Sequence, residues 1–266
     1  MELIQRIAFY FPAIFLTTFI IAAPFETFLH YKVQTKRFEE FTRYSFFHKN
    51  KEEAVFDFSG NTLSGKMVSL SNHSVYMITE HSGGESGGFY HLTFVYKDLK
   101  DHKLKHYTFS DISGYASIEV VDINADKKKE LVIDSDRGYQ KSFIYKNQTI
   151  ALTPAAYQGE KGVYKDVYVF EKGSLRKAVK DKEYASYYEK QFQKTEETLR
   201  KLKGKVFQSG KGQADAFLIE VIQYLSYMTD YNRYNSAMEN IKKSEIRIQA
   251  NEAYLLYEVL IEKENK

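Results

Sequence analysis

The stretch that decides the fold contains two apolar and aromatic runs on either side of a loop of glycine and serine: Val75-Tyr76-Met77-Ile78 and Tyr90-His91-Leu92-Thr93-Phe94-Val95-Tyr96. Short runs rich in β-branched and aromatic residues, bounded by turn residues, are typical of β-strands. Glycine and serine between them favour a turn. The two runs therefore predict a β-hairpin.

Further short runs of this kind occur on both sides of the hairpin, at intervals of about 8–12 residues. They are Ala54–Phe58, Lys105–Phe109, Ser117–Val121, Glu130–Ile133, Ser142–Tyr145 and Val163–Phe170. Many short strands at such intervals are typical of antiparallel sandwiches and barrels. Residues 54–180 are therefore predicted to form a mainly antiparallel β domain, either a sandwich or an open barrel.

After residue 180 the apolar residues recur every three and four positions, which is the period of one helix face. Tyr184, Tyr188 and Phe192 begin this pattern. It predicts a helical bundle or helical hairpin over residues 181–266, with three segments and a fourth at 253–260. A spacing of three also links four aromatic residues nearer the N-terminus: Phe38, Phe41, Tyr44 and Phe47. It predicts a juxtamembrane amphipathic helix within residues 26–53. The fold class expected is α+β.

The N-terminal segment is apolar: Ile7–Phe25 contains no charged residue and follows Arg6. Two interpretations of residues 1–25 stay open. A secretory signal peptide could be cut after Ala22, whereas a retained membrane anchor needs roughly 17–25 apolar residues. Both place the globular part outside the cytoplasm, in the periplasm or at the extracellular face of a cell envelope, expected to be bacterial.

The amino-acid composition excludes several kinds of site and argues against one class of partner. The chain of 266 residues contains no cysteine, which excludes disulfides, zinc–thiolate sites and cysteine nucleophiles. Its net charge is only +3, and basic and acidic residues interleave along the sequence, which argues against a nucleic-acid partner. A protein partner is expected instead, through the helical region, where Tyr187 and Tyr227 lie off the predicted core face and aromatic residues are frequent interface anchors.

The most specific motif is the segment Asp122-Ile123-Asn124-Ala125-Asp126-Lys127-Lys128-Lys129-Glu130. Side-chain oxygens fall at its first, third, fifth and ninth positions. Calcium takes six to eight oxygen ligands, and a tight loop can direct alternate side chains inward. The spacing therefore predicts a calcium site in which Asp122, Asn124, Asp126 and Glu130 donate side-chain oxygens and Lys128 donates its backbone carbonyl. A polar hairpin turn without an ion is the alternative.

Residues 118–145, which contain this motif, resemble a single FG-GAP or VCBS-type repeat: a strand, an Asp-x-Asn-x-Asp loop, and an acidic residue leading into Leu-Val-Ile. The resemblance implies calcium held between two strands outside the cytoplasm, and an adhesive or partner-binding role. Two departures are evident. Such loops usually have glycine where Ala125 and Lys127 stand, and three consecutive lysines lie beside the proposed cation.

A second motif, Gly84-Glu85-Ser86-Gly87-Gly88, fits the G-x-S-x-G pattern of serine hydrolases. That chemistry needs a downstream histidine, yet the last histidine of the chain is His106. A flexible hairpin tip is the competing interpretation. Nearby, His81 and His91 could face one another and bind a transition metal, or could simply be strand residues.

These observations predict a non-enzymatic extracytoplasmic binding or scaffolding protein with a structural calcium loop. The alternative is an extracytoplasmic serine hydrolase that uses Ser86.

Overall fold

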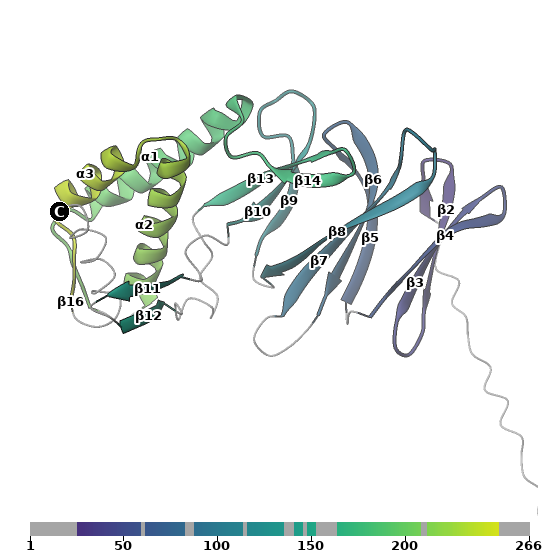
Figure 1. The fold of residues 1–266 in the computed structure, drawn as a ribbon, viewed down its shortest axis with the longest axis horizontal. Coiled ribbons are helices and arrows are strands. Elements are labelled where there is room, and N and C mark those ends of the chain that lie inside the picture. The colour runs from purple at the N-terminus through teal and green to yellow at the C-terminus, as the bar shows by residue number, and fades with distance from the viewer. Residues whose placement is uncertain are drawn as a thin grey trace, which may run out of the picture.

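The computed structural model describes most of the chain (Figure 1). The described ranges are 26–59, 62–82, 88–113, 116–135, 141–145, 148–152, 164–208 and 212–249. The predicted signal peptide or anchor at 1–25, residues 84–87 of the Ser86 motif and the fourth helical segment at 253–260 lie outside them. No helix within these ranges is both long and apolar enough to span a membrane.

Three four-stranded antiparallel sheets stand in a row (Figure 1). Sheet A has the order β1-β2-β3-β4, sheet B the order β5-β6-β7-β8, and sheet C the order β14-β13-β10-β9. The strands of sheet A are β1 (Glu26–Phe28), β2 (Tyr31–Arg37), β3 (Thr42–His48) and β4 (Lys51–Phe58). Those of sheet B are β5 (Thr62–Leu70), β6 (His73–His81), β7 (Phe89–Lys97) and β8 (Leu104–Ser113). Those of sheet C are β9 (Ile118–Val121), β10 (Glu130–Asp134), β13 (Lys165–Glu171) and β14 (Ser174–Lys177).

Sheet B is covered on both faces, which explains the uninterrupted apolar run at its centre. Successive side chains of a strand point to opposite faces. Tyr76 and Ile78 pack with sheet A in one hydrophobic cluster, whereas Val75 and Met77 pack with sheet C in another. The predicted hairpin is confirmed, because β6 pairs with β7 in antiparallel register, with Tyr76 opposite Val95.

The helical region covers the far face of sheet C and completes the row. Its core cluster joins Val167 and Val169 of β13 to residues of all three helices, such as Phe192, Tyr224 and Met238. The helical elements are a short 3-10 helix (Lys182–Tyr184), α1 (Ala185–Lys201), α2 (Gly212–Asp230) and α3 (Tyr234–Ser244). Two small additions are the hairpin of β11 (Lys141–Tyr145) with β12 (Gln148–Leu152), and the parallel pair of β15 (Val206–Gln208) with β16 (Arg247–Gln249).

The mixed, mostly antiparallel architecture with a C-terminal helical part is confirmed. The strands form separate open sheets rather than one barrel. The helix predicted within residues 26–53 is wrong, since this segment forms β1 to β3 and the first residues of β4. The spacing of three between Phe38 and Phe41 spans the β2–β3 turn, where the two rings stack with centroids 4.5 Å apart. Tyr44 and Phe46, by contrast, lie two residues apart in β3 and belong to the same hydrophobic cluster, as residues on one face of a strand do.

Candidate functional site

The predicted calcium motif forms the loop between two paired strands. β9 ends at Val121, which lies opposite Glu130, the first residue of β10. Residues 122–129 connect the two strands without regular secondary structure. This placement agrees with the strand–loop–strand order expected from the sequence.

Three predicted oxygen donors hold the loop in a curled conformation through its own amides. The Lys127 amide donates to Asp122 Oδ2 at 2.9 Å, the Asp126 amide to Asn124 Oδ1 at 3.2 Å, and the Lys128 amide to Asp126 Oδ1 at 2.8 Å. Such side-chain-to-backbone bonds are the usual reason for Asp and Asn in turns. The last of them holds the pKa of Asp126 below its ordinary value, which favours the carboxylate form.

The backbone of the loop adopts a conformation that non-glycine residues rarely adopt. Ala125 has a φ of 62° and Lys127 a φ of 69°. These are the two positions at which FG-GAP-type loops usually have glycine, so the backbone is left-handed despite the departure in sequence. Left-handed angles at side-chain-bearing residues cost free energy and persist where the surrounding structure imposes them.

Glu130 is a buried carboxylate at the base of the loop. It is 1% exposed, and burial raises its pKa. The Ile123 amide donates to Oε2 at 3.2 Å, and the Tyr184 hydroxyl, from the 3-10 helix, donates to Oε1 at 3.3 Å. Glu130 thereby joins the loop to the start of the helical region.

The remaining oxygens give a mixed fit to calcium. Asp122 Oδ1 is buried and accepts no hydrogen bond in the structure, as expected of an oxygen that an ion could satisfy. Asp126 Oδ2, however, lies 3.3 Å from the Lys128 ammonium. Across the described ranges, no group of three or more His, Cys, Asp or Glu side chains is arranged to hold a metal. A calcium site would therefore need the Asn124 amide, the Lys128 carbonyl and water besides the carboxylates.

The loop contacts three parts of the fold. The Ser71 amide, in the turn between β5 and β6, donates to the Lys129 carbonyl at 2.9 Å, and the Phe170 amide of β13 donates to Ser71 Oγ at 3.0 Å. Ile123 packs on the core of the helical region. The loop thus lies where sheet B, sheet C and the helices meet.

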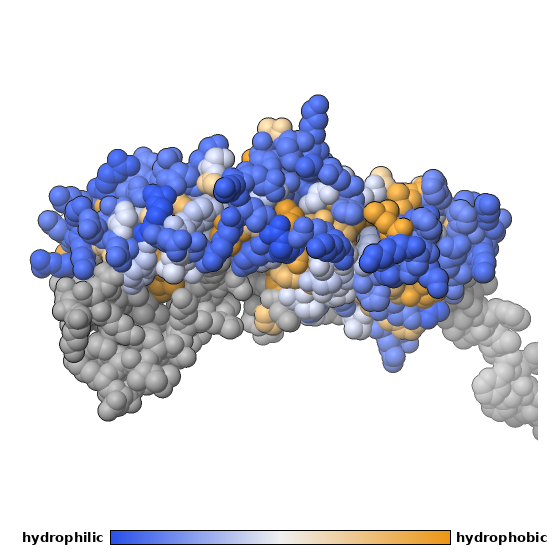
Figure 2. All heavy atoms as spheres, turned by 45° about the horizontal axis from the view of Figure 1, so that its top comes forward, coloured by the Kyte–Doolittle hydropathy of each residue, from blue (hydrophilic) through white to orange (hydrophobic). Residues whose placement is uncertain are grey.

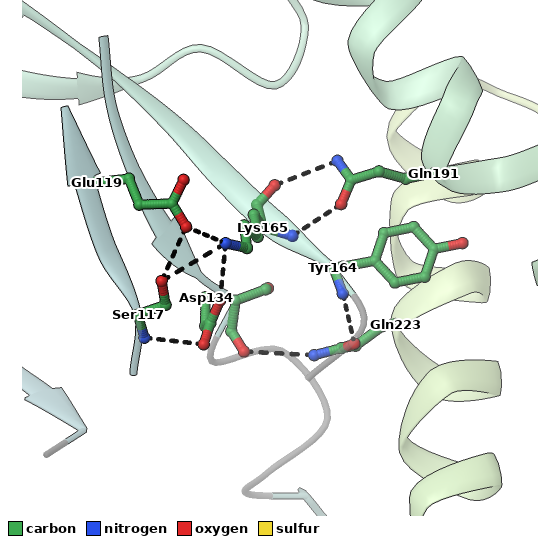
Figure 3. A network of polar contacts seen from close by, with 8 residues as sticks. Ser117, Glu119, Asp134, Tyr164, Lys165, Gln191 and Gln223 are labelled. Atoms are coloured by element: carbon green, nitrogen blue, oxygen red, sulfur yellow. Dashed lines mark hydrogen bonds and ion pairs between the residues drawn. The ribbon is translucent and has the colours of Figure 1, made fainter. Parts of the chain in front are cut away.

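A second polar network fastens β13 to the helices (Figure 3). Gln191 of α1 accepts a hydrogen bond from the Lys165 amide at 2.8 Å and donates to the Lys165 carbonyl at 3.3 Å. Gln223 of α2 accepts from the Tyr164 amide and donates to the Ser135 carbonyl, both at 3.3 Å. The two amide side chains satisfy backbone groups at the start of β13 and just after β10, as a neighbouring strand would.

Two residues of the same strand, Lys165 and Asp166, form ion pairs. The Lys165 ammonium contacts Glu119, and Asp134 at 3.8 Å (Figure 3). The Asp166 carboxylate, 1% exposed, accepts hydrogen bonds from the Lys177 ammonium at 2.7 Å and the Tyr227 hydroxyl at 2.6 Å. Burial raises the pKa of the Tyr227 hydroxyl, so this phenol stays protonated and acts as a donor. The buried hydrogen bond between Tyr227 and Asp166 joins α2 to β13 of sheet C.

One alternative weighed from the sequence and one expected role do not hold. His91 pairs with Glu80 and His81 with Tyr90, so the two histidines lie on opposite faces of sheet B and cannot share a metal. Tyr227 was expected at a partner surface but is fully buried. Its hydroxyl is satisfied by Asp166, a pairing between distant segments that helix periodicity does not reveal.

No family model, no curated protein and no solved structure matches this chain. The resemblance of residues 118–145 to an FG-GAP or VCBS-type repeat stays a prediction, carried by the loop alone.

Proposed function

We propose that this chain is a non-enzymatic binding or scaffolding protein of a bacterial cell envelope, with its globular part outside the cytoplasm. The Asp122–Glu130 loop holds one structural calcium ion, and the helical region binds a protein partner. The observation that carries the calcium role is the buried Asp122 Oδ1, which accepts no hydrogen bond, in a loop with left-handed backbone at both Ala125 and Lys127.

The ion would be held by the side chains of Asp122, Asn124, Asp126 and Glu130 and by the Lys128 carbonyl. It would supply positive charge that draws these oxygens together and offsets the mutual repulsion of the carboxylates. Because Glu130 and Ile123 contact the helical region, an ion in the loop would stabilise the junction between sheet C and the helices. That role is structural and requires no reaction.

The test is calcium titration calorimetry on chelator-treated protein, alongside thermal unfolding. We expect one ion per chain, with a dissociation constant of about 0.1–1 mM, as in extracellular calcium modules. At a free calcium concentration of about ten times that constant, binding stabilises the fold by about 1.4 kcal/mol. Asp122→Ala should abolish both the heat and the thermal shift.

Asp101→Ala is the matched control. Like Asp122, Asp101 accepts a hydrogen bond from a backbone amide of its own turn, that of Lys103 at 3.1 Å, but this turn joins β7 to β8 in sheet B. Its substitution should leave calcium binding intact. Absence of heat and of any thermal shift for the wild type at about 10 mM calcium, well above the expected constant, would show that the loop is only a turn.

The envelope location rests on the apolar segment before residue 26 and needs its own test. Alkaline phosphatase and β-galactosidase, each fused after Lys266, report the side of the membrane on which the C-terminus lies. Phosphatase activity without β-galactosidase activity is expected. The reverse pattern would place the globular part in the cytoplasm.

A further inference from the structure

Two basic segments that are far apart in the sequence meet at the end of the helical region. The Gly204 amide donates to the Ser244 carbonyl at 2.8 Å, and the Arg247 amide donates to the Lys205 carbonyl at 3.0 Å. β15 and β16 then pair in parallel, with Val206 opposite Arg247. This end lies at the opposite extreme of the row from sheet A (Figure 1).

Four exposed cations gather there, from both segments: Arg200, Lys203, Lys205 and Arg247, which we call the basic end. Their neighbours Lys201 and Lys243 form ion pairs with acidic side chains on their own helices, at 2.9 and 3.1 Å. Among the described residues, no acidic side chain forms an ion pair with any residue of the basic end. Figure 2 shows hydrophilic residues over the outer surface of the helical end.

The partial negative charge at the C-terminal ends of α1 and α3 explains only some of the cations in this region. Basic residues in the last turn of a helix interact favourably with its partial negative charge. Arg200 lies in the last turn of α1, as Lys242 does in that of α3. Lys203, Lys205 and Arg247 lie beyond the helix ends. The Lys205 ammonium lies over the Phe207 ring, 4.8 Å from its centroid, but among the described residues no carboxylate pairs with Lys203, Lys205 or Arg247. A binding role accounts for their uncompensated positive charge better than helix polarity does.

The surroundings of these cations favour a polypeptide over a phosphate polymer. Val206 follows Lys205 in the chain and lies opposite Arg247 in the β15–β16 pair. It is 46% exposed. Neither β15 nor β16 pairs with a third strand of the described chain. An extended peptide can add to such an edge through main-chain hydrogen bonds, with its side chains giving selectivity. An inorganic polyanion would use neither Val206 nor a strand edge.

We infer that the basic end, with Val206 and the β15–β16 edge, is the docking surface for an acidic, extended segment of a partner protein. This inference rests on the proposed binding function and names the chemistry of the partner. Acidic side chains of the segment would face the basic end, and an apolar side chain would cover Val206.

The test uses the full-length chain and a fluorescein-labelled decapeptide of alternating glutamate and valine, measured by fluorescence anisotropy. Wild type should bind it saturably, and more weakly as salt rises. The triple variant Lys203→Glu, Lys205→Glu, Arg247→Glu should bind at least about ten-fold more weakly, because each reversal replaces attraction with repulsion. Val206→Ser should weaken binding several-fold.

The control reverses three exposed lysines elsewhere: Lys51, Lys66 and Lys100. Because its net charge equals that of the triple variant, unchanged affinity attributes the loss to the basic end. Equal weakening in both, no saturable binding by wild type, an unaffected Val206→Ser, or binding of polyphosphate but not the peptide would each overturn the inference.

The two proposals fail separately. Asp126→Ala should abolish calcium binding and retain peptide binding. Loss of the peptide with calcium binding intact rejects the docking surface alone, whereas peptide binding without any calcium heat rejects only the calcium role.

Discussion

Tyr227→Phe removes one hydroxyl from the buried junction between sheet C and the helices. That hydroxyl donates to Asp166 Oδ1 at 2.6 Å and lies 2.9 Å from Ser135 Oγ. Tyr227 is completely buried and Asp166 is 1% exposed. Water therefore cannot replace the lost donor without a rearrangement of the core.

The magnitude follows from the charge of the acceptor. A hydrogen bond to a charged group contributes about 1.5–3 kcal/mol, against about 0.5–1.5 kcal/mol for a neutral pair. The Lys177 ammonium, 2.7 Å from Asp166 Oδ2, remains as a partner. The cost should therefore stay below the roughly 3–5 kcal/mol of a fully broken buried ion pair. We expect a loss of about 2 kcal/mol.

Urea unfolding, followed by circular dichroism, measures this loss. With a denaturant slope of about 2 kcal/mol/M, the midpoint should fall by about 1 M. Tyr231→Phe is the matched control, because the Tyr231 hydroxyl donates to a neutral acceptor, the Val179 carbonyl, at 2.7 Å. Its midpoint should fall by about half as much.

A Tyr227→Phe midpoint that shifts no more than the control midpoint would refute the reasoning. It would mean that Lys177 alone satisfies Asp166, and that the tyrosine contributes packing only. A change in the denaturant slope would instead report a change in the unfolded state or a loss of two-state behaviour.

Three further substitutions test other parts of the fold. Gly65→Ala should lower the unfolding free energy by about 1–3 kcal/mol through overpacking, because the added Cβ would lie 2.7 Å from the buried Tyr76 ring. Urea unfolding measures this loss. The control is Ser64→Ala at the exposed neighbouring position, which should leave the unfolding free energy almost unchanged. Gln191→Met should cost about 1–3 kcal/mol in the same assay, since the Lys165 amide loses its acceptor. Burial raises the pKa of Glu220 above its ordinary value of 4.5. The folded chain therefore keeps the carboxyl proton of Glu220 to higher pH than the unfolded chain does. The protonated Glu220 favours the folded state at low pH, and this stabilisation is lost as pH rises through the raised pKa. Glu220→Gln should remove the loss: the stability of wild type relative to the variant should fall as pH rises above the ordinary glutamate pKa of 4.5, and a constant difference would contradict the assignment.

Strand segments that are buried on both faces could be predicted from the sequence, because nearly every position in them is apolar or aromatic. Val75–Ile78 is apolar at every position because both faces of β6 are covered. β5 was missed, since Ser64, Gly65 and Lys66 give it little strand character. It is an edge strand whose exposed positions need no apolar side chains. Gly65 is required instead by the close approach of Tyr76, which no local pattern reveals.

The candidate loop was located from residue spacing, but its surroundings were not. Spacing placed oxygens at Asp122, Asn124 and Asp126, and the structure shows each bonded to a loop amide. The contacts of the loop with Ser71 and Tyr184 join segments about fifty residues away on either side. Contacts of that kind depend on the order of the sheets, which single-strand patterns do not encode.

The basic end went unpredicted for the same reason. Along the sequence, acidic and basic residues interleave, and neither 200–205 nor 242–247 suggests a binding surface alone. Only the pairing of β15 with β16 brings Lys205 and Arg247 together. A charge count along the chain therefore underestimates the local charge that the fold creates.

The order of the layers relates the proposed calcium loop to the proposed docking surface. Among the described residues, the hydrophobic clusters join each layer to its neighbours: sheet A to sheet B, sheet B to sheet C, and sheet C to the helices. Stability in such an arrangement is close to a sum of neighbour interfaces. The proposed calcium loop lies at the joint where sheet B, sheet C and the helices meet, where one ion would reinforce two interfaces. On the retained-anchor interpretation of residues 1–25, sheet A follows the membrane attachment in the chain, and the basic end lies at the far extreme of the row (Figure 1). The sheets would then act as a spacer that presents the docking surface away from the bilayer.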